Sequence, residues 1–583
     1  MQRSRLRMAL GLTPALAAAV LLLAAAPAPP KAGGPKSGGP ALPLPAGAER
    51  AAQAINRGSL EAPIRFLADD RLEGRGPASR GDELARLYLQ SSLETLGYQP
   101  GGPNGGWQQP FDMVGVHATM PETWTFQAGS ETVSLQRSED YIAASGVDRE
   151  QAVLANAPLV FVGYGIQAPE YQWDDFKGMD LKGKVLVMMN NDPDWDPKLF
   201  EGKRRLYYGR WTYKYESAAR QGAAGVIILH TTPSAGYPWQ VVQTSWSGEQ
   251  FALPPTPGEP QIQIKGWATE AATRRLLKAA GKDLDELVKQ ARSRDFKPVP
   301  LGITTSLILK NEVRKVKTAN VAGLLPGSDP KLKDEVVIFS AHHDHLGIGN
   351  PDKNGDKIYN GAVDNASGDA TVLAIAKAFA ALPERPRRSI LILFVAAEEQ
   401  GLLGSQYYAE HPTFPAGRIA ANINYDSTNV LGKTTNLTFV GLGKSSLDKI
   451  VQTLAARQGR TVEDDAFPDR GHFYRSDQFN FAKIGVPAIY LNPGTDYRGR
   501  SKEWGKEQAE EYEAHRYHQP SDEFDPKWDY SGMIEDAQLG FFAGLTIAQQ
   551  TALPAWNKGD EFEAARLKAL AAVGKGKDGR AGR

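Results

Sequence analysis

The sequence predicts an α/β protein with a mixed central β-sheet, helices on both of its faces, and a second, β-rich module inserted into the chain. Short apolar runs at 335–341 and 389–395 flank a helical pattern at 368–382. Continuously apolar strands are typical of sheets covered on both faces. Charged residues follow these runs directly, where open α/β sheets place their sites. At 583 residues the chain is also too long for one ordinary core, so we expect more than one domain.

The amino-terminal residues 1–27 resemble a secretory signal peptide. Three arginines precede an apolar run at 10–23, and small residues suited to cleavage follow it at 24–28. A membrane anchor is the alternative, but the run is shorter than the roughly 18 residues that a spanning helix needs. We therefore expect an exported protein, periplasmic or secreted, with no stable membrane insertion after cleavage.

Composition excludes several classes of protein. Lys plus Arg and Asp plus Glu both total 67, so the net charge is zero and we expect no nucleic-acid partner. The chain has no cysteine, which excludes disulfides, thiolate metal sites and lipid attachment through cysteine.

Changes in composition and in hydrophobic pattern divide the sequence into successive parts. A Pro/Gly/Ala-rich linker is predicted at 28–48. A helix capped by Gly81-Asp82 should follow, ending at Gly97, with a buried row of leucines. That row is Leu84, Leu87, Leu89, Leu93 and Leu96. The predicted parts are 49–149, the amino-terminal part of the main domain; 150–300, an inserted module; 301–553, the rest of the main domain; and 554–583, a polar, mobile tail.

The sequence of the inserted module predicts alternating short strands and helices. Strands are expected at 158–162, 184–189 and 226–229, and a helix from about 268 to 294. No metal-ligand cluster occurs in this stretch, so the module is predicted to have no chemistry of its own.

Five short polar motifs carry the functional prediction. Each alone is typical of a turn or an exposed surface. Together they put acids directly after apolar strands, which is a poor place for charge unless something binds it. The motifs are Ser340–His345, Asn360–Gly368, Ala396–Glu399, Asn424–Asp426 and Tyr517–Asp522.

These motifs contain the donors for two divalent cations. Two close cations need a negative group between them, and Asp364 suits that position. Each cation then needs an imidazole and a carboxylate to make a zinc-type site, which His342 and His518, with Glu399 and Asp426, can supply.

Three further residues complete this interpretation. Glu398 is left free to act as a general base. Asp344 would accept a proton from the His342 ring and fix its tautomer. His343 and His345 are alternative ligands to His342, and the His-x-Asp spacing favours His342.

The motifs, in this order, resemble those of the M28 family of zinc aminopeptidases and related peptidases. The resemblance spans about 315–550 and implies a zinc exopeptidase fold with two Zn²⁺ ions per chain. It implies that His342, Asp364 and Asp426 bind one zinc, and Asp364, Glu399 and His518 the other. It further implies that Glu398 is the general base, that Tyr517 stabilises the oxyanion, and that Arg475, Ser476 and Asp477 line the substrate site. Residues 150–300 resemble the protease-associated (PA) domain inserted in many members.

The expected function is removal of amino-terminal residues from peptide substrates. A carboxypeptidase is an alternative, because Arg470, Arg475 or Arg498 could bind a substrate carboxylate. Some relatives instead cyclise amino-terminal Gln. A non-catalytic binding protein is the third alternative; it is disfavoured because every ligand position and the base are retained.

Overall fold

A computed structural model describes residues 42–246 and 248–578 of the chain. The predicted signal peptide at 1–27 and most of the predicted linker at 28–48 lie outside the described residues. The described residues belong to one structural unit. None of the described helices combines the length and the apolar character that a membrane span requires.

The central sheet is mixed, as predicted. Strands β17, β14, β18 and β21 are parallel to one another, whereas β13 and β19 run antiparallel to their neighbours β17 and β21. The order across this part of the sheet is β2 (Gln108–Thr119), β13 (Val299–Leu325), β17 (Ser389–Val395), β14 (Val336–His342), β18 (Ile419–Asn424), β21 (Ala488–Pro493), β19 (Asn436–Phe439) and β20 (Thr461–Glu463).

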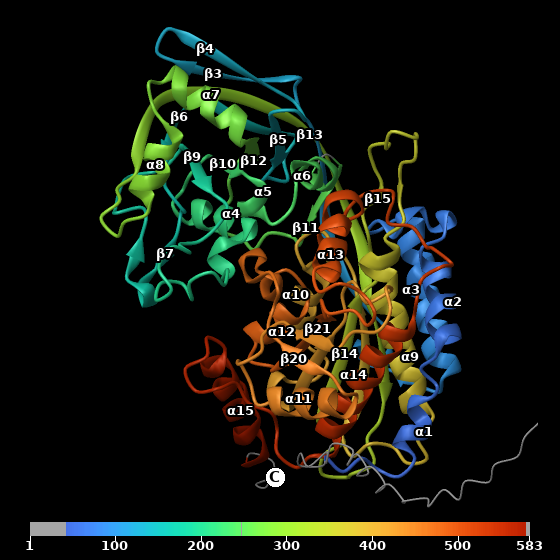
Figure 1. Ribbon diagram of the computed structural model, residues 1–583. Helices are drawn as coiled ribbons and strands as arrows, with labels where there is room; N and C mark the ends of the chain where they lie inside the picture. Colours follow the sequence, from blue (N-terminus) through green and yellow to red (C-terminus); the bar gives the residue numbers. More distant parts are fainter. Residues whose placement is uncertain (1–41, 247, 579–583) are drawn as a thin grey trace, which may run out of the picture. The chain divides into compact units, whose positions relative to one another are not determined.

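Helices cover both faces of this sheet, which confirms the predicted fold class. Successive side chains of a strand point to opposite faces. Val337 and Phe339 of β14 therefore join the core beneath α9 (Ser367–Ala380) and α14 (Ser531–Gln549). Ile338 faces the other way, into the core with α10 (Leu403–Glu410) and α12 (Gln478–Lys483). Figure 1 shows α9 and α14 beside β14, with α2 next to α9.

The amino-terminal helices pack against the α9 side of the sheet. They are α1 (Ala48–Ala52), α2 (Arg57–Leu67) and α3 (Arg80–Thr95), and they share one core with α9. The predicted cap and leucine row of α3 need correction. Ser79 caps the helix by accepting from Asp82 N. Leu89 and Leu93 are buried but Leu87 is 56% exposed, because positions two apart lie about 200° apart around a helix. Gly97, with φ +81°, does follow the helix end.

The second module has its own group of strands within the one 17-stranded sheet. Parallel strands β6 (Gln151–Phe161), β9 (Val185–Met189), β10 (Gly225–His230) and β12 (Ile264–Thr269) form its centre, and β5 (Tyr141–Ser145) adds an antiparallel strand. The buried cluster around these strands takes in Met120 to Leu309, on both sides of 150–300, and it also includes main-domain residues such as Phe473 and Phe479. The remaining strands are β3 (Thr123–Ala128), β4 (Glu131–Gln136), β7 (Gln167–Ala168), β8 (Trp173–Asp174) and β11 (Gln250–Ala252).

The module's helices differ from the prediction in one place. The single helix expected at 268–294 is two helices, α7 (Glu270–Ala279) and α8 (Leu284–Ala291). Gly281 between them has φ +65°, a left-handed conformation that ends α7. The other helices are α4 (Trp211–Arg220), α5 (Thr232–Ala235) and α6 (Trp239–Trp246).

Strand β13 physically joins the two parts. Its first half pairs with β6 and β3 of the module, and its second half pairs with β17 of the central sheet. Strand β2 runs antiparallel beside it from Lys310 to Val321. A continuous two-stranded ribbon therefore connects the module to the sheet (Figure 1).

The tail predicted to be mobile is attached along its described part. Helix α15 (Glu563–Asp578) carries the buried Arg566, whose guanidinium donates to Ile419 O at 3.0 Å and Pro554 O at 3.1 Å. A polar helix thus docks on the sheet through one buried arginine. The remaining helices are α11 (Asp448–Arg457) and α13 (Trp504–His515).

Candidate metal centre

Sheet register brings three of the motifs to one edge. His342 ends β14 opposite Val395 of β17, and Ser340 is opposite Asn424 of β18. Because these strands are parallel, Glu398, Glu399 and Asp426 emerge beside His342. Two linking residues, Ala397 and Ser427, have φ of +55° and +57°. Left-handed backbone is uncommon in such residues and tends to occur at functional sites.

The loop before α9 holds Asp364 over this edge. The backbone N–H groups of Val363 and Asp364 both donate to the carboxylate of Asp522, at 3.0 Å each for the shortest contacts. Asn365 ties the loop to the end of β18, since its Nδ2 donates to Tyr425 O at 3.0 Å. Asp522, the last residue of the final motif, is therefore a support for Asp364.

Asp364 stands between two imidazole–carboxylate pairs. Its Oδ1 is 3.2 Å from His342 Nε2 and its Oδ2 is 3.4 Å from His518 Nε2. Asp426 Oδ1 is 3.5 Å from His342 Nε2, and Glu399 Oε2 is 2.9 Å from His518 Nε2. The structure thus brings together all five residues that were predicted as ligands.

The donor atoms fit zinc. His342 Nε2, His518 Nε2 and Glu399 Oε1 are buried and have no hydrogen-bond partner, which is costly unless something else satisfies them. Imidazole nitrogen with carboxylate oxygen is a zinc donor set. Among the described residues, two overlapping groups place their ligand atoms within 4.8 Å of one another: His342, Glu398 and Asp426, and His342, Asp364 and Glu399. A carboxylate oxygen of Glu398 therefore lies as close to the other donor atoms as those of the predicted ligands do.

The three histidines near position 342 have different surroundings. His342 faces Asp364 and Asp426. His343, on the opposite side of the strand end, lies 2.9 Å from Asp82 on α3. His345 Nδ1 is 2.6 Å from Glu399 Oε1. Of the three, only His342 lies between Asp364 and Asp426.

Asp344 supports the acidic pair as well as His342. Its carboxylate accepts from the backbone N–H of Glu398 at 3.0 Å and of Glu399 at 3.4 Å. The same carboxylate is 3.7 Å from His342 Nδ1, whereas the backbone oxygen of Asp344 is nearer, at 3.3 Å. The orientation of the His342 ring therefore depends on the main chain of Asp344 as much as on its side chain.

Charge in this centre is strongly perturbed. Burial raises the pKa of Glu398 well above its usual value, and repulsion from Asp426 and Glu399 adds to this against the attraction of His342. Burial disfavours the charge on His518, but Glu399 and Asp364 outweigh it and raise its pKa to about 10. The carboxylates together create a negative potential that attracts cations.

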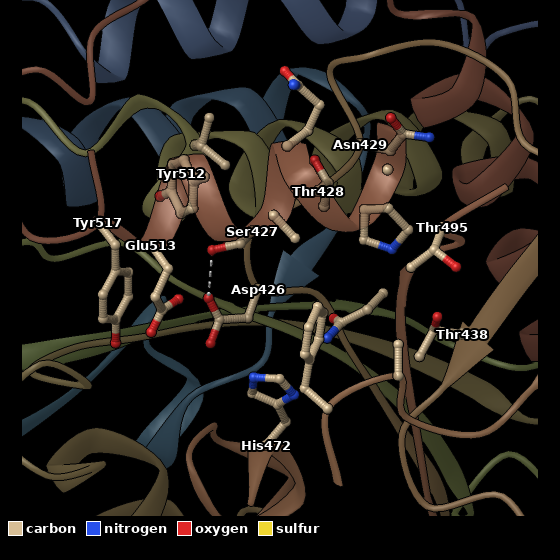
Figure 2. Close-up of a pocket in the computed structure, with 18 of the residues that line it drawn as sticks. Asp426, Ser427, Thr428, Asn429, Thr438, His472, Thr495, Tyr512, Glu513 and Tyr517 are labelled. Atoms are coloured by element: carbon tan, nitrogen blue, oxygen red, sulfur yellow. Dashed lines mark hydrogen bonds between the residues drawn. The ribbon is translucent and has the colours of Figure 1, made fainter. Parts of the chain in front are cut away.

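A cavity of about 270 Å³ opens beside the centre. Asp364, Glu398 and Asp426 line it at one end, and much of the rest is apolar or aromatic. Figure 2 draws Asp426, His472, Tyr512 and Tyr517 around this cavity. Its apolar lining includes Val430, Leu431, Phe467 and Tyr490.

The residues predicted to bind substrate behave differently from one another. Arg475 lines this cavity and a second, smaller one, and its Nη2 donates to Tyr517 Oη at 3.1 Å. Ser476 and Asp477 line neither, and both are buried. Ser476 Oγ instead accepts from Asn424 Nδ2 at 2.8 Å, and burial raises the pKa of Asp477 to about 7. Neither residue lines the two cavities beside the centre, so their predicted contact with substrate stays a prediction.

The structure also locates Tyr517 and the two other arginines that could bind a substrate carboxylate, Arg470 and Arg498. The Tyr517 ring stacks on His518 with centroids 3.9 Å apart, and Tyr517 lines both cavities. Arg470 lines the larger cavity only, and Arg498 lines neither.

The second cavity, of about 70 Å³, includes residues that sequence reasoning missed. Arg210, Tyr237 and Ser245 of the module line it together with Glu398, Glu399 and His518 of the main domain. Ser245 Oγ is 2.7 Å from His518 Nδ1. Residues of the module therefore line this cavity, which the sequence did not indicate. A lone serine or arginine has no distinctive spacing in sequence, so only the fold could reveal it.

Comparison with known proteins agrees with this geometry. Residues 320–542 match the sequence model of peptidase family M28. Leupeptin-inactivating enzyme 1 of Streptomyces exfoliatus is 28% identical over 184 residues, which cover 31% of this chain and 37% of that protein. Aminopeptidase NAALADL1 of Rattus norvegicus is 25% identical over 290 residues, covering 43% and 36%. The matches thus span little more than a third of these curated relatives.

A solved structure shares the fold. The aminopeptidase from Aneurinibacillus sp. strain AM-1 superposes with a TM-score of 0.51 at 19% identity, covering 85% of this chain and 95% of that one. The segment matched to the family contains every residue of the centre, from His342 to His518. The part of the chain that is similar to peptidase family M28 is therefore residues 320–542, which hold the whole centre.

Proposed function

We propose that this chain is an exported dizinc aminopeptidase that removes amino-terminal residues from peptides. The observation that carries the proposal is Asp364, whose two oxygens lie 3.2 Å from His342 Nε2 and 3.4 Å from His518 Nε2. Two cations this close need a negative group between them. Asp426 would complete the site at His342, and Glu399 the site at His518.

The chain's own residues have distinct tasks in this proposal. Zinc bound here would polarise the scissile carbonyl and activate water. Glu398 lines the larger cavity, so its carboxylate can take a proton from the attacking water and pass it to the leaving amine. Tyr517, held by Arg475, would donate its O–H to the developing oxyanion.

The larger cavity suits an amino-terminal residue with an uncharged side chain. A free amino group is a cation, and the carboxylates of Glu398 and Asp426 line the end of this cavity. Its apolar wall, with Leu431 and Phe467, would receive the side chain. Leu and Phe should therefore be preferred over Asp and Glu.

A panel of aminoacyl p-nitroanilides tests the proposal. Leu and Phe substrates should be hydrolysed, activity should disappear with a zinc chelator, and added Zn²⁺ should restore it. N-acetylated versions should be resistant. Equal turnover of free and acetylated substrates would show that no amino terminus is recognised. Metal analysis of the purified protein should give two zinc ions per chain.

A carboxypeptidase is the second candidate, and one observation favours it. Arg210 Nε and Arg475 Nη1 are buried without a hydrogen-bond partner, and both side chains line the smaller cavity beside Glu398. Buried cations of this kind seek an anion, such as a terminal carboxylate. Peptides blocked only at the amino end, compared with peptides amidated only at the carboxyl end, separate the two candidates.

Export and the identity of the module are parts of the same proposal. Residues 1–27 would be removed as a signal peptide, so amino-terminal sequencing of the exported protein should begin near Ala28. We also propose that residues 150–300 form a PA-like domain.

A further inference from the structure

His518 contacts the module through the nitrogen that faces away from the other ligands. Its Nε2 lies near Glu399 and Asp364, at 2.9 and 3.4 Å. Its Nδ1 lies 2.7 Å from Ser245 Oγ. An imidazole that offers Nε2 to a metal carries its proton on Nδ1 and needs an acceptor there. Ser245 Oγ is in position to be that acceptor.

The helix that carries Ser245 contacts the same segment at a second point. Gln240, earlier on α6, donates from Nε2 to Gln519 Oε1 at 3.2 Å. Helix α6 therefore contacts two consecutive residues of the main domain, His518 and Gln519. Both contacts cross from the module to the main domain.

Helix α6 is itself firmly supported inside the module. Trp246 packs edge-on against Trp211 and Trp267, with ring centroids 4.9 and 6.1 Å apart. Trp239 Nε1 and Gln243 Nε2 both donate to Ser138 O at 2.7 Å. A side chain on such a support can fix the geometry of a partner ring.

The backbone at His518 makes this support important. His518 has φ +56°, a left-handed conformation that is costly for a residue with a side chain. Such a conformation persists only where surrounding contacts hold it. The flanking contacts from α6 are of this kind.

We propose that Ser245 is a positioning residue that accepts the Nδ1–H of His518 and so orients Nε2 for zinc. The module would then be a structural part of one of the two metal sites. This inference rests on the proposed binding of zinc by His518. It assigns Ser245 no contact with substrate.

Zinc affinity of the metal-depleted protein tests the proposal. Competition with a chromogenic chelator should show that Ser245→Ala binds one of the two zinc ions about 10- to 100-fold more weakly than wild type. Ser245→Thr, which keeps the hydroxyl, should restore the affinity. Thr244→Ala is the matched control, because the Thr244 hydroxyl bonds only to carbonyls of its own helix.

Melting of the zinc-free proteins separates positioning from folding. Zinc-free Ser245→Ala should have the same Tm as the zinc-free wild type, since the substitution affects only the segment that carries the ligand His518. Unchanged zinc affinity in Ser245→Ala would overturn the proposal, and so would a Ser245→Thr variant as weak as Ser245→Ala. A wild-type chain that binds two zinc ions yet hydrolyses no peptide would contradict the proposed function and leave this inference standing.

Discussion

Glu398 lies where it could act either as a metal ligand or as a general base. It lies 3.9 Å from His342 Nε2, within reach of a cation, and it also lines both cavities. We expect Glu398→Gln to keep two zinc ions and to lose about 10²- to 10⁴-fold in kcat, the usual contribution of a general base. Metal analysis measures the zinc content of the variant, and steady-state kinetics measures the loss in kcat. Loss of a zinc ion from this variant would make Glu398 a ligand, whereas Asp426→Asn, the comparison variant, should lose metal affinity.

His343 provides a second residue-scale prediction. Asp82 is fully buried and accepts from His343, from Arg86 and from Thr318 Oγ1 at 2.9 Å. Asp82→Ala would leave these groups without a partner, so the free energy of unfolding should fall by about 3 kcal/mol, with zinc content unchanged. Denaturant titration and metal analysis measure the two effects. The reverse pattern, stable protein without zinc, would move His343 into the metal centre.

The sequence alone could not distinguish His342 from its neighbours for a simple reason. His342, His343 and His345 are equally polar, and alternation along a strand end decides which side each one faces. That alternation depends on where β14 ends, which is the least certain part of any prediction from sequence. Asp364 and Asp426 raised no such problem, because neither has an adjacent residue of the same kind, whereas Glu399 had to be distinguished from Glu398 beside it.

At the scale of elements, the strands were easier to predict than the helices. The run at 389–395 coincides with β17 because a strand buried on both faces is continuously apolar. Helix α3 was harder, since leucines on opposite sides of the helix look alike in sequence. Arg566 of α15 shows the same problem, because a buried arginine and a solvated one are identical until its carbonyl partners are known.

Strand β10 carries a titratable group that should make the module sensitive to acid. Burial lowers the pKa of His230 from its usual 6.5 to about 4, and its Nε2 contacts Tyr237 O. The unfolded chain then binds a proton at a higher pH than the folded chain does. Stability is therefore fully present above pH 6.5 and is lost as pH falls towards 4, by about 3 kcal/mol for 2.5 units.

His230→Gln is the variant that isolates this effect. Gln keeps a donor for Tyr237 O and does not titrate, so its unfolding free energy should change less between pH 7 and pH 4.5. Denaturant midpoints for both proteins at the two pH values measure the difference. Equal pH dependence in the two proteins would show that His230 contributes nothing to acid sensitivity.

Over the whole molecule, the contribution of the module to the site is what sequence could not predict. Ser245 and His518 are 273 positions apart, and the β2–β13 ribbon is what carries the module to the sheet edge. Contacts of this range depend on packing between segments far apart in the sequence, and one buried cluster joins the module to main-domain residues such as Phe473. No local pattern near Ser245 encodes them. The motif residues, by contrast, could be grouped from their order alone, since three of the motifs follow neighbouring strands β14, β17 and β18.

The same architecture makes stability depend on zinc. Ligand atoms of Asp364 and Glu399 lie within 4.8 Å of one another, and Asp364 and Asp426 both approach His342 Nε2. Like charges so close oppose folding unless cations offset them. A ligand that binds only the folded state stabilises it by RT ln(1 + [L]/Kd), which is about 2.7 kcal/mol at 100 times Kd. Zinc added to the metal-depleted protein should therefore raise its Tm.

Two controls make this last expectation specific. Mg²⁺ at the same concentration should have little effect, because imidazole ligands suit zinc and magnesium prefers oxygen. Asp364→Ala should lose most of the zinc response, since it removes the carboxylate that faces both His342 and His518. Calorimetry of the full chain measures all four conditions. A zinc response that survives in Asp364→Ala would mean that the stabilising ion binds elsewhere, and the two sites would then not share Asp364 as a bridge.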